Sequence, residues 1–399
     1  MTKREFLEML NKLTSRLSES ERDRLLEYYG EIIDDRMEEG LSEAEAVAAL
    51  GDPAALTRDY ADPAAEGVTP PARPADENVA ALNGLRIRVD NADVTIARGT
   101  LANGAAAQLR FSDPARFEWR MDGDVMEIVE KTPNGSLFSL QRVLHLLSSP
   151  TQRVKITLAT PLDGALSYAA GGGDLVLEGA SFGGGAGIDS ASGDVTLRTF
   201  DCGGDLKLAT RSGDVRLEGV RVAGALRVHL ASGDLASTHL AVAGPARIEA
   251  ASGDIALRKP DLEALSVATA SGDIELFQGS AAATEIHAAS GDVSLEAVEC
   301  NPTLAIDTAN GDVSLRRCIA LETRIKTASG DVDLRLTRLE CGYDIAANTA
   351  SGEVRLPDDN PPAREGLRQP KLAIRTASGD INVKISGNRQ FRHEKTLLA

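Results

Sequence analysis

The stretch ASGDVTLRTF, residues 191–200, contains a Ser-Gly-Asp corner followed by alternating apolar and polar residues. The chain repeats this unit, for example as RSGDVRLEGV from residue 211 and ASGDIALRKP from residue 251. Most copies follow one another after 19 or 20 residues, and such a period sustained over eleven corners predicts a solenoid. The acidic corner residues are Asp174, Asp194, Asp214, Asp234, Asp254, Asp273, Asp292, Asp312, Asp331, Glu353 and Asp380.

The apolar residues around the corners indicate β-strands. Val195 and Leu197 alternate with polar residues after one corner, and Leu206 and Leu208 do so before the next. A period of two places one face of each strand in the core and the other in solvent. The sequence therefore predicts a mainly β fold, a parallel β-helix (β-solenoid) with coils of about 20 residues, preceded by a small all-α helical module. The aromatic content of 4% suits a narrow aliphatic core.

The corner residues have a structural interpretation. Glycine at the second position suits a backbone with positive φ, and the serine before it can bond locally. The aspartate after it can accept N–H groups of its own turn. Glu353 at the same position indicates that the corner admits one longer side chain. We therefore predict structural corners at Gly193, Asp194, Gly213, Asp214, Gly233, Asp234, Gly253 and Asp254.

A second interpretation of the corner carboxylates is a Ca²⁺-binding ladder, because stacked like charges must be hydrogen-bonded, solvated or cation-bound. Calcium-binding repeats carry glycine and aspartate more densely than this chain, which favours the structural interpretation. A residue repeated eleven times is also a poor candidate for a unique catalytic position. We predict no catalytic residue and no cofactor. The ladder alternative comprises Asp194, Asp214, Asp234, Asp254, Asp273, Asp292, Asp312 and Asp331.

Residues 1–61 show helical spacing of apolar residues, and Ser42 with Glu45 forms a capping-box pattern. Residues 1–65 contain eight basic and sixteen acidic residues, a net charge of −8, and the whole chain carries −17. This balance argues against direct nucleic-acid binding, which requires excess Lys and Arg. We therefore predict a helical module that docks a protein partner through residues 1–65.

The remaining chain divides by composition. Residues 62–78 are rich in Pro and Ala and predict an extended linker, and residues 79–387 form the predicted β-helix. Within it, SLFSLQRVLHLLSS (136–149) predicts a covering helix, and residues 388–399 form a tail. The cysteines lack C-x-x-C spacing and are expected in the core; they are Cys202, Cys300, Cys318 and Cys341.

Two family resemblances add to this interpretation. The first 60 residues, including LLEYYGEIIDDRMEEGLSEAEAVAALGDP, resemble the bacterial HAAS domain, the HTH-associated alpha-helical signalling domain. That resemblance implies a signalling role, with a PadR-like transcription regulator as partner. From about residue 80, LRIRVDNADVTIARG, RVKITLATP and the TASGDV copies resemble the bacterial adhesin-like β-strand repeat family, whose members are largely of unknown function.

We therefore expect a non-enzymatic bacterial signalling or scaffold protein whose β-helix presents an extended interaction surface. Two alternatives stay open: a self-assembling, bactofilin-like structural β-helix, and a carbohydrate-active β-helix enzyme. The sequence shows no run of about 18 apolar residues and no signal-peptide pattern, so we expect no membrane span and a cytoplasmic location. The expected state is a monomer or a small homo-oligomer.

Overall fold

The computed structural model describes residues 1–14, 42–48, 77–131 and 152–386, together with residues 22, 23, 26, 29, 30, 33, 37, 50 and 53. They belong to two compact units, one mainly helical and one built of strands. The expected covering helix at 136–149, the tail at 388–399 and residues 62–76 of the linker lie outside the described residues. In the part of the chain that is described, no helix is long and apolar enough to cross a membrane.

The helical unit contains α1 (Lys3–Leu13) and α3 (Glu43–Ala48). The hydroxyl of Thr2 accepts from the Glu5 N–H, and the Glu5 carboxylate accepts from the Thr2 N–H, which closes a capping box. The predicted Ser42–Glu45 box is confirmed by the same pair of bonds, 3.4 and 3.0 Å long. Phe6 packs against Tyr29 with ring centroids 5.8 Å apart, so the apolar stripe of α1 supplies the core of this unit.

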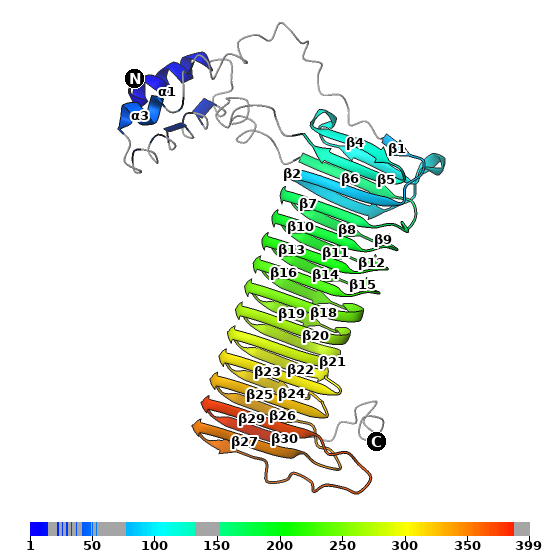
Figure 1. Cartoon of the computed structure of the whole chain (residues 1–399), viewed down its shortest axis with the longest axis vertical. Coiled ribbons are helices and arrows are strands. Elements are labelled where there is room, and N and C mark those ends of the chain that lie inside the picture. The colour runs from blue at the N-terminus through cyan, green and yellow to red at the C-terminus, as the bar shows by residue number, and fades with distance from the viewer. Residues whose placement is uncertain are drawn as a thin grey trace. The chain divides into compact units, whose positions relative to one another are not determined.

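The β unit confirms the predicted parallel β-solenoid (Figure 1). Each regular coil contributes strands to three faces, and every strand pairs with its equivalent in the next coil. The first face contains β7 (Leu166–Gly172), β10 (Ala186–Ser192), β13 (Leu206–Ser212), β16 (Leu226–Ser232), β23 (Thr303–Asn310), β25 (Glu322–Ser329), β29 (Lys371–Ser378) and β27 (Asp344–Ser351).

The second face contains β8 (Leu175–Glu178), β11 (Val195–Arg198), β14 (Val215–Glu218), β17 (Leu235–Thr238), β19 (Ile255–Arg258), β22 (Val293–Glu299), β24 (Val313–Arg316), β26 (Val332–Leu336), β30 (Ile381–Ile385) and β28 (Val354–Arg355). The short third face contains β9 (Ser181–Phe182), β12 (Asp201–Cys202) and β15 (Arg221–Val222). Three longer strands bend around from one face to another: β18 (Ala241–Ser252), β20 (Asp261–Ser271) and β21 (Ile274–Ser290).

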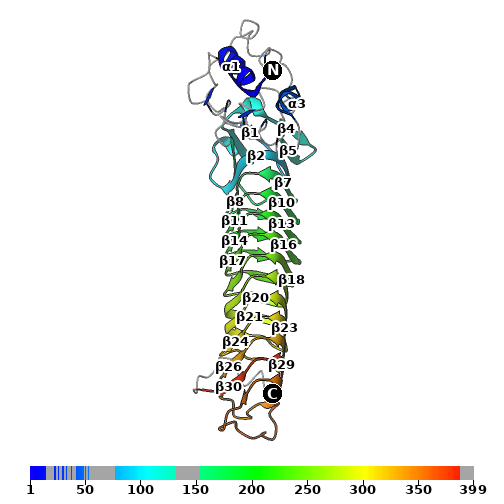
Figure 2. The same cartoon turned by 90° about the vertical axis from the view of Figure 1, so that its left-hand side faces the viewer.

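The coil register keeps inward residues inward. Val195 pairs with Val215, and Leu206 pairs with Leu226, and all four are fully buried. Because the side-chain period of a strand is two, this register stacks aliphatic residues in columns along a narrow core. Figure 2 shows the first-face strands, such as β10 and β13, and the second-face strands, such as β11 and β14, on opposite sides of the solenoid.

The N-terminal end of the solenoid departs from the coil pattern. The first coil is β2 (Gly84–Arg98), which pairs in parallel with β5 (Val125–Glu130). The strand β5 also pairs antiparallel with β4 (Phe117–Asp122), which precedes it in the chain, while β6 (Gln152–Leu158) pairs antiparallel with β3 (Ala107–Phe111). Two 3₁₀ turns, Ala102–Gly104 and Pro114–Arg116, connect strands here.

The predicted linker ends earlier than expected. Glu77 and Asn78 belong to β1 (Glu77–Val79), because this short strand pairs antiparallel with β3.

The C-terminal coils are stacked in a different order from the chain. The strand β29 lies between β25 and β27, and β30 lies between β26 and β28. The chain therefore forms the last coil of the stack with β27 and β28, and then returns through residues 356–370 to fill the position before it. Figure 1 shows this inversion, with β27 beyond β29.

Candidate functional site

The corner glycines have a backbone that other residues adopt at a cost. Gly193, Gly213 and Gly233 have φ of +114°, +129° and +114°. A Cβ atom on Gly213 would also lie 2.3 Å from the carbonyl oxygen of Gly193 in the preceding coil. Both observations require glycine, the first through backbone sterics and the second through the close approach of neighbouring coils.

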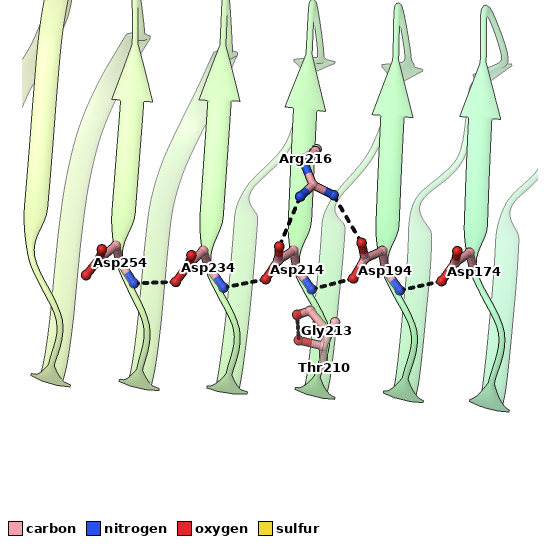
Figure 3. Close-up of polar contacts among 8 residues, drawn as sticks. All are labelled: Asp174, Asp194, Thr210, Gly213, Asp214, Arg216, Asp234 and Asp254. Carbon is pink, nitrogen blue, oxygen red and sulfur yellow. Dashed lines mark hydrogen bonds and ion pairs between the residues drawn. The ribbon is translucent and has the colours of Figure 1, made fainter.

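The corner aspartates form a continuous ladder of hydrogen bonds between coils. The backbone N–H of Asp214 donates to Oδ1 of Asp194 at 2.9 Å, and Asp214 Oδ1 accepts from the N–H of Asp234 at 3.0 Å (Figure 3). We expected each aspartate to bond within its own turn. The bonds run between coils instead, because neighbouring strands lie close enough for a short carboxylate to reach the next N–H. The same bond, 2.7–3.0 Å long, joins all consecutive rungs from Asp93 to Glu353.

The corner serines also bond between coils. The hydroxyl of Ser232 donates to the carbonyl of Arg211 at 3.0 Å, and Ser252 and Ser290 make the equivalent bonds to Ala231 and Ala270. The Ser-Gly-Asp corner therefore contributes one side-chain donor, one side-chain acceptor and one close backbone approach to the contact with its neighbour.

Arginine neutralises part of the ladder. Arg216 Nη1 lies 3.1 Å from Asp194 Oδ2, and its Nη2 lies 3.0 Å from Asp214 Oδ2 (Figure 3). A second inter-coil bond of the same type joins the N–H of Ala225 to Asp205, and that bond, with Arg227, holds the pKa of Asp205 below its usual range. These ion pairs are half exposed and screened by solvent, so each adds little to the stability of the fold.

The two ends of the ladder differ from its middle. Asp174 donates to Asp93, so the ladder begins in the first coil, within NADVTI. Glu353 donates its N–H to Asp380 and stands in the last coil of the stack. Its carboxylate accepts from Arg355, two residues further along the chain. Our interpretation of Glu353 as a tolerated longer corner residue needs correction: within the described residues no further coil follows, so the short side chain is not required there.

The ladder geometry bears on the calcium alternative. One oxygen of each interior corner carboxylate already accepts a backbone N–H, which leaves the other to face solvent or arginine. Ca²⁺ takes six to eight oxygen ligands. Among the residues that the structure describes, no group of three His, Cys, Asp or Glu side chains is arranged to hold a metal ion.

The solenoid surface offers shallow grooves that run across several coils. One of about 970 Å³ follows the third face and is lined by small residues such as Gly203 and Ala223 and by the charged residues Asp201, Arg221 and Glu263. Arg221 and Asp201 are paired at 2.7 Å. A groove formed by equivalent residues of successive coils suits an extended ligand.

A charged cluster near the N-terminal end was missed by the sequence interpretation. Glu127, whose side chain is 4% exposed, accepts from Arg120 at 2.8 Å, with Arg88 and Arg86 at 3.4 and 3.9 Å. Arg120 holds the pKa of the Glu127 carboxyl below its usual range. The sequence signal was the LRIRVD alternation, which places both arginines of β2 on the outward face.

The four cysteines are free and buried. Burial raises the pKa of Cys300 to about 12 and that of Cys318 to about 11. Only the thiolate form of cysteine is reactive, and the raised pKa keeps these two thiols protonated at neutral pH. We therefore assign them a packing role in the core.

The helical unit exposes apolar side chains. Met9 and Leu13 lie one turn apart on α1 and are 43% and 41% exposed, beside the buried Phe6 and Leu10. Met37 is also exposed. Two apolar side chains exposed one turn apart on a helix of a small acidic unit suit a protein-binding surface.

Comparison with known proteins found solved structures with low similarity to this chain. No curated protein matches this chain. A solved structure of a provisionally named adhesin from Bacteroides fragilis is similar, with 15% identity, 79% of this chain and 99% of that chain covered, and a TM-score of 0.28. A provisionally named cell adhesion protein from Clostridium sporogenes is similar at 11% identity, with 79% and 100% covered and a TM-score of 0.16.

Two family models match the chain. The HAAS model matches residues 5–59, which confirms the resemblance seen in the sequence. The Toastrack DUF4097 model matches residues 82–276 and again 245–396. Because these matches span most of the chain, the protein belongs to the Toastrack DUF4097 family and carries a HAAS domain at its N-terminus.

Proposed function

We propose that this protein is a non-enzymatic signalling scaffold. Its HAAS domain docks a protein partner, a PadR-like transcription regulator, and its solenoid presents an extended surface to other ligands. The observation that carries the docking role is the exposed pair Met9 and Leu13 on α1. Burying the part of these side chains that is still exposed contributes roughly 1 kcal/mol each, under half of the value for a fully exposed side chain.

The polar residues of the solenoid also support the scaffold role, because they make contacts between neighbouring coils. The repeated carboxylates hold coils together, and the outward ion pairs, such as Arg221 with Asp201, join neighbouring coils in the same way. A carbohydrate-active enzyme would instead need a pair of carboxylates set on opposite sides of a bond. The grooves across the coils suit recognition of an extended chain.

A titration tests the docking role. Purified full-length protein is titrated with a PadR-like regulator from the same genome, and compared with a variant carrying Met9→Glu and Leu13→Glu. We expect the variant to bind at least tenfold more weakly, because two charges would face an apolar contact. The control is Glu8→Ala on the same helix, whose ion pair with Arg4 is exposed and contributes little.

The proposal fails if the regulator does not bind the wild-type chain, or if the double variant binds as tightly as the control. Circular dichroism must show that the variants keep their helical content.

A further inference from the structure

The last coil of the stack has one open side. The strands β27 and β28 pair with β29 and β30 on one side, and in the described part of the chain no strand pairs with their other edge. Figure 1 shows β27 as the final rung of the solenoid. Unpaired backbone N–H and C=O groups along an edge are a template for further strand pairing.

The apolar cross-section of this coil is partly exposed. Val354 is 36% exposed and Leu356 is 46% exposed, and Ile345 is half-buried. Their register partners in the preceding coil, Ile381 for Val354 and Leu372 for Ile345, are 0% and 3% exposed. Residues that point inward in every other coil therefore meet solvent here.

Most of the edge strand lacks charge, since Asp344 at its start is its one charged residue. From Ile345 to Ser351, β27 has no charged residue, although the chain as a whole carries −17. At the register position of Asn348, the two preceding rungs carry Arg375 and Lys326. Exposed edge strands usually carry charges or proline that block pairing, and the seven residues after Asp344 carry neither.

The opposite end of the solenoid is protected. There β4 carries Glu118, Arg120 and Asp122 within six residues, and among the described residues it pairs with β5 alone. An unprotected edge at one end and a charged edge at the other allow a closed pair of molecules and disfavour a filament.

We propose that the coil of β27 and β28 is a dimer interface, through which two copies of this chain join by the C-terminal ends of their solenoids. A two-fold axis places the same coil on both sides, so the apolar cross-sections match in size and the two β27 edges run antiparallel. The uncharged stretch 345–351 reduces like-charge contacts between two acidic molecules, and the Glu353 carboxylate of the same coil is already paired with Arg355. This inference goes beyond the proposed function and does not depend on the docking of a regulator.

The mass of the full chain in solution tests the dimer. We expect light scattering to give twice the monomer mass of 42.0 kDa, independent of concentration above the dissociation constant. The double variant Val354→Lys and Leu356→Lys should fall to 42.0 kDa with an unchanged circular dichroism spectrum, because both side chains already reach solvent in one copy. The control, Met121→Lys, changes a residue of similar exposure (37%) at the other end and should stay dimeric.

Cross-linking gives a second measurement that does not depend on the lysine variants. Asn348→Cys should form a covalent dimer with a short bis-maleimide, whereas Arg375→Cys, one rung further from the interface, should not. The native cysteines are buried and should not react.

The proposal is overturned by a wild-type mass of 42.0 kDa at all concentrations, by masses that grow beyond two copies, or by a dimer in which Asn348→Cys does not cross-link.

Discussion

The backbone N–H of Asp380 donates to Oδ1 of Asp331 at 2.7 Å, although 49 residues separate them in the chain. Glu353, which precedes Asp380 in the sequence, follows it in the ladder. The Ser-Gly-Asp corner thus makes the same contact with the neighbouring coil whether or not that coil is the next one in the sequence. The pairing depends on the shape of the corner, and the order of coils depends on the connecting loops.

The position of Glu353 leads to a first prediction. Asp331→Glu should destabilise the protein by about 1 kcal/mol, because a longer side chain displaces the acceptor from the N–H of Asp380. Glu353→Asp should change stability by less than about 0.5 kcal/mol, since the described structure places no coil after it. Urea unfolding midpoints measure both. Equal effects of the two changes would contradict the reordered ladder.

The role of the corner carboxylate gives a second prediction. Asp214→Asn keeps an oxygen acceptor for the N–H of Asp234, whereas Asp214→Ala removes it. We expect Ala to cost about 1 kcal/mol and Asn to stay within about 0.5 kcal/mol of wild type, because the lost ion pair with Arg216 is half exposed. If Asn is as damaging as Ala, the charge and not the acceptor geometry holds the corner.

The sequence alone was enough to identify the repeat, but it was not enough to predict the order in which the coils stack. The alternation at Val195 and Leu197 identified strands, because core burial has the same period as the strand. The step of 27 residues between Glu353 and Asp380 marked an insertion, but loop length does not determine where a coil stacks. The N-terminal cap around Glu127 was also missed, since antiparallel pairing breaks the period on which the repeat analysis rests.

The corner glycine provides a third prediction. Gly213→Ala should destabilise the protein by about 3 kcal/mol, because φ is +129° and the new Cβ would lie 2.3 Å from the Gly193 oxygen. Gly187→Ala is the matched control: it lies in a strand, and a Cβ there meets no atom within 4 Å. The control should be neutral or stabilising by about 0.5 kcal/mol. A Gly213 variant as stable as the control would exclude the proposed constraint.

The Glu127 cluster gives a prediction on pH. Arg120 lowers the pKa of Glu127 in the folded protein, so its contribution to stability is present above the unfolded pKa, near 4.3, and is lost as pH falls through the folded value. Glu127→Gln should therefore lower the melting temperature at pH 7, and the difference from wild type should shrink toward pH 3. The control is Glu263→Gln at an exposed site, whose effect should be small at both pH values. A difference that stays constant with pH would indicate a purely steric role.

Calcium addition separates the two interpretations of the ladder. Oδ1 of each interior corner aspartate accepts a backbone N–H, and Arg216 occupies Oδ2 of two neighbours, so few oxygens are left to replace the hydration shell of an ion. We expect the melting temperature to be the same with millimolar calcium and with chelator. Arg216→Ala sharpens the test, because it frees two adjacent carboxylate oxygens in the middle of the ladder. A rise in melting temperature with calcium that chelator reverses, in the wild type, would show that the carboxylate column binds cations, and a rise in the variant alone would show that arginine excludes them.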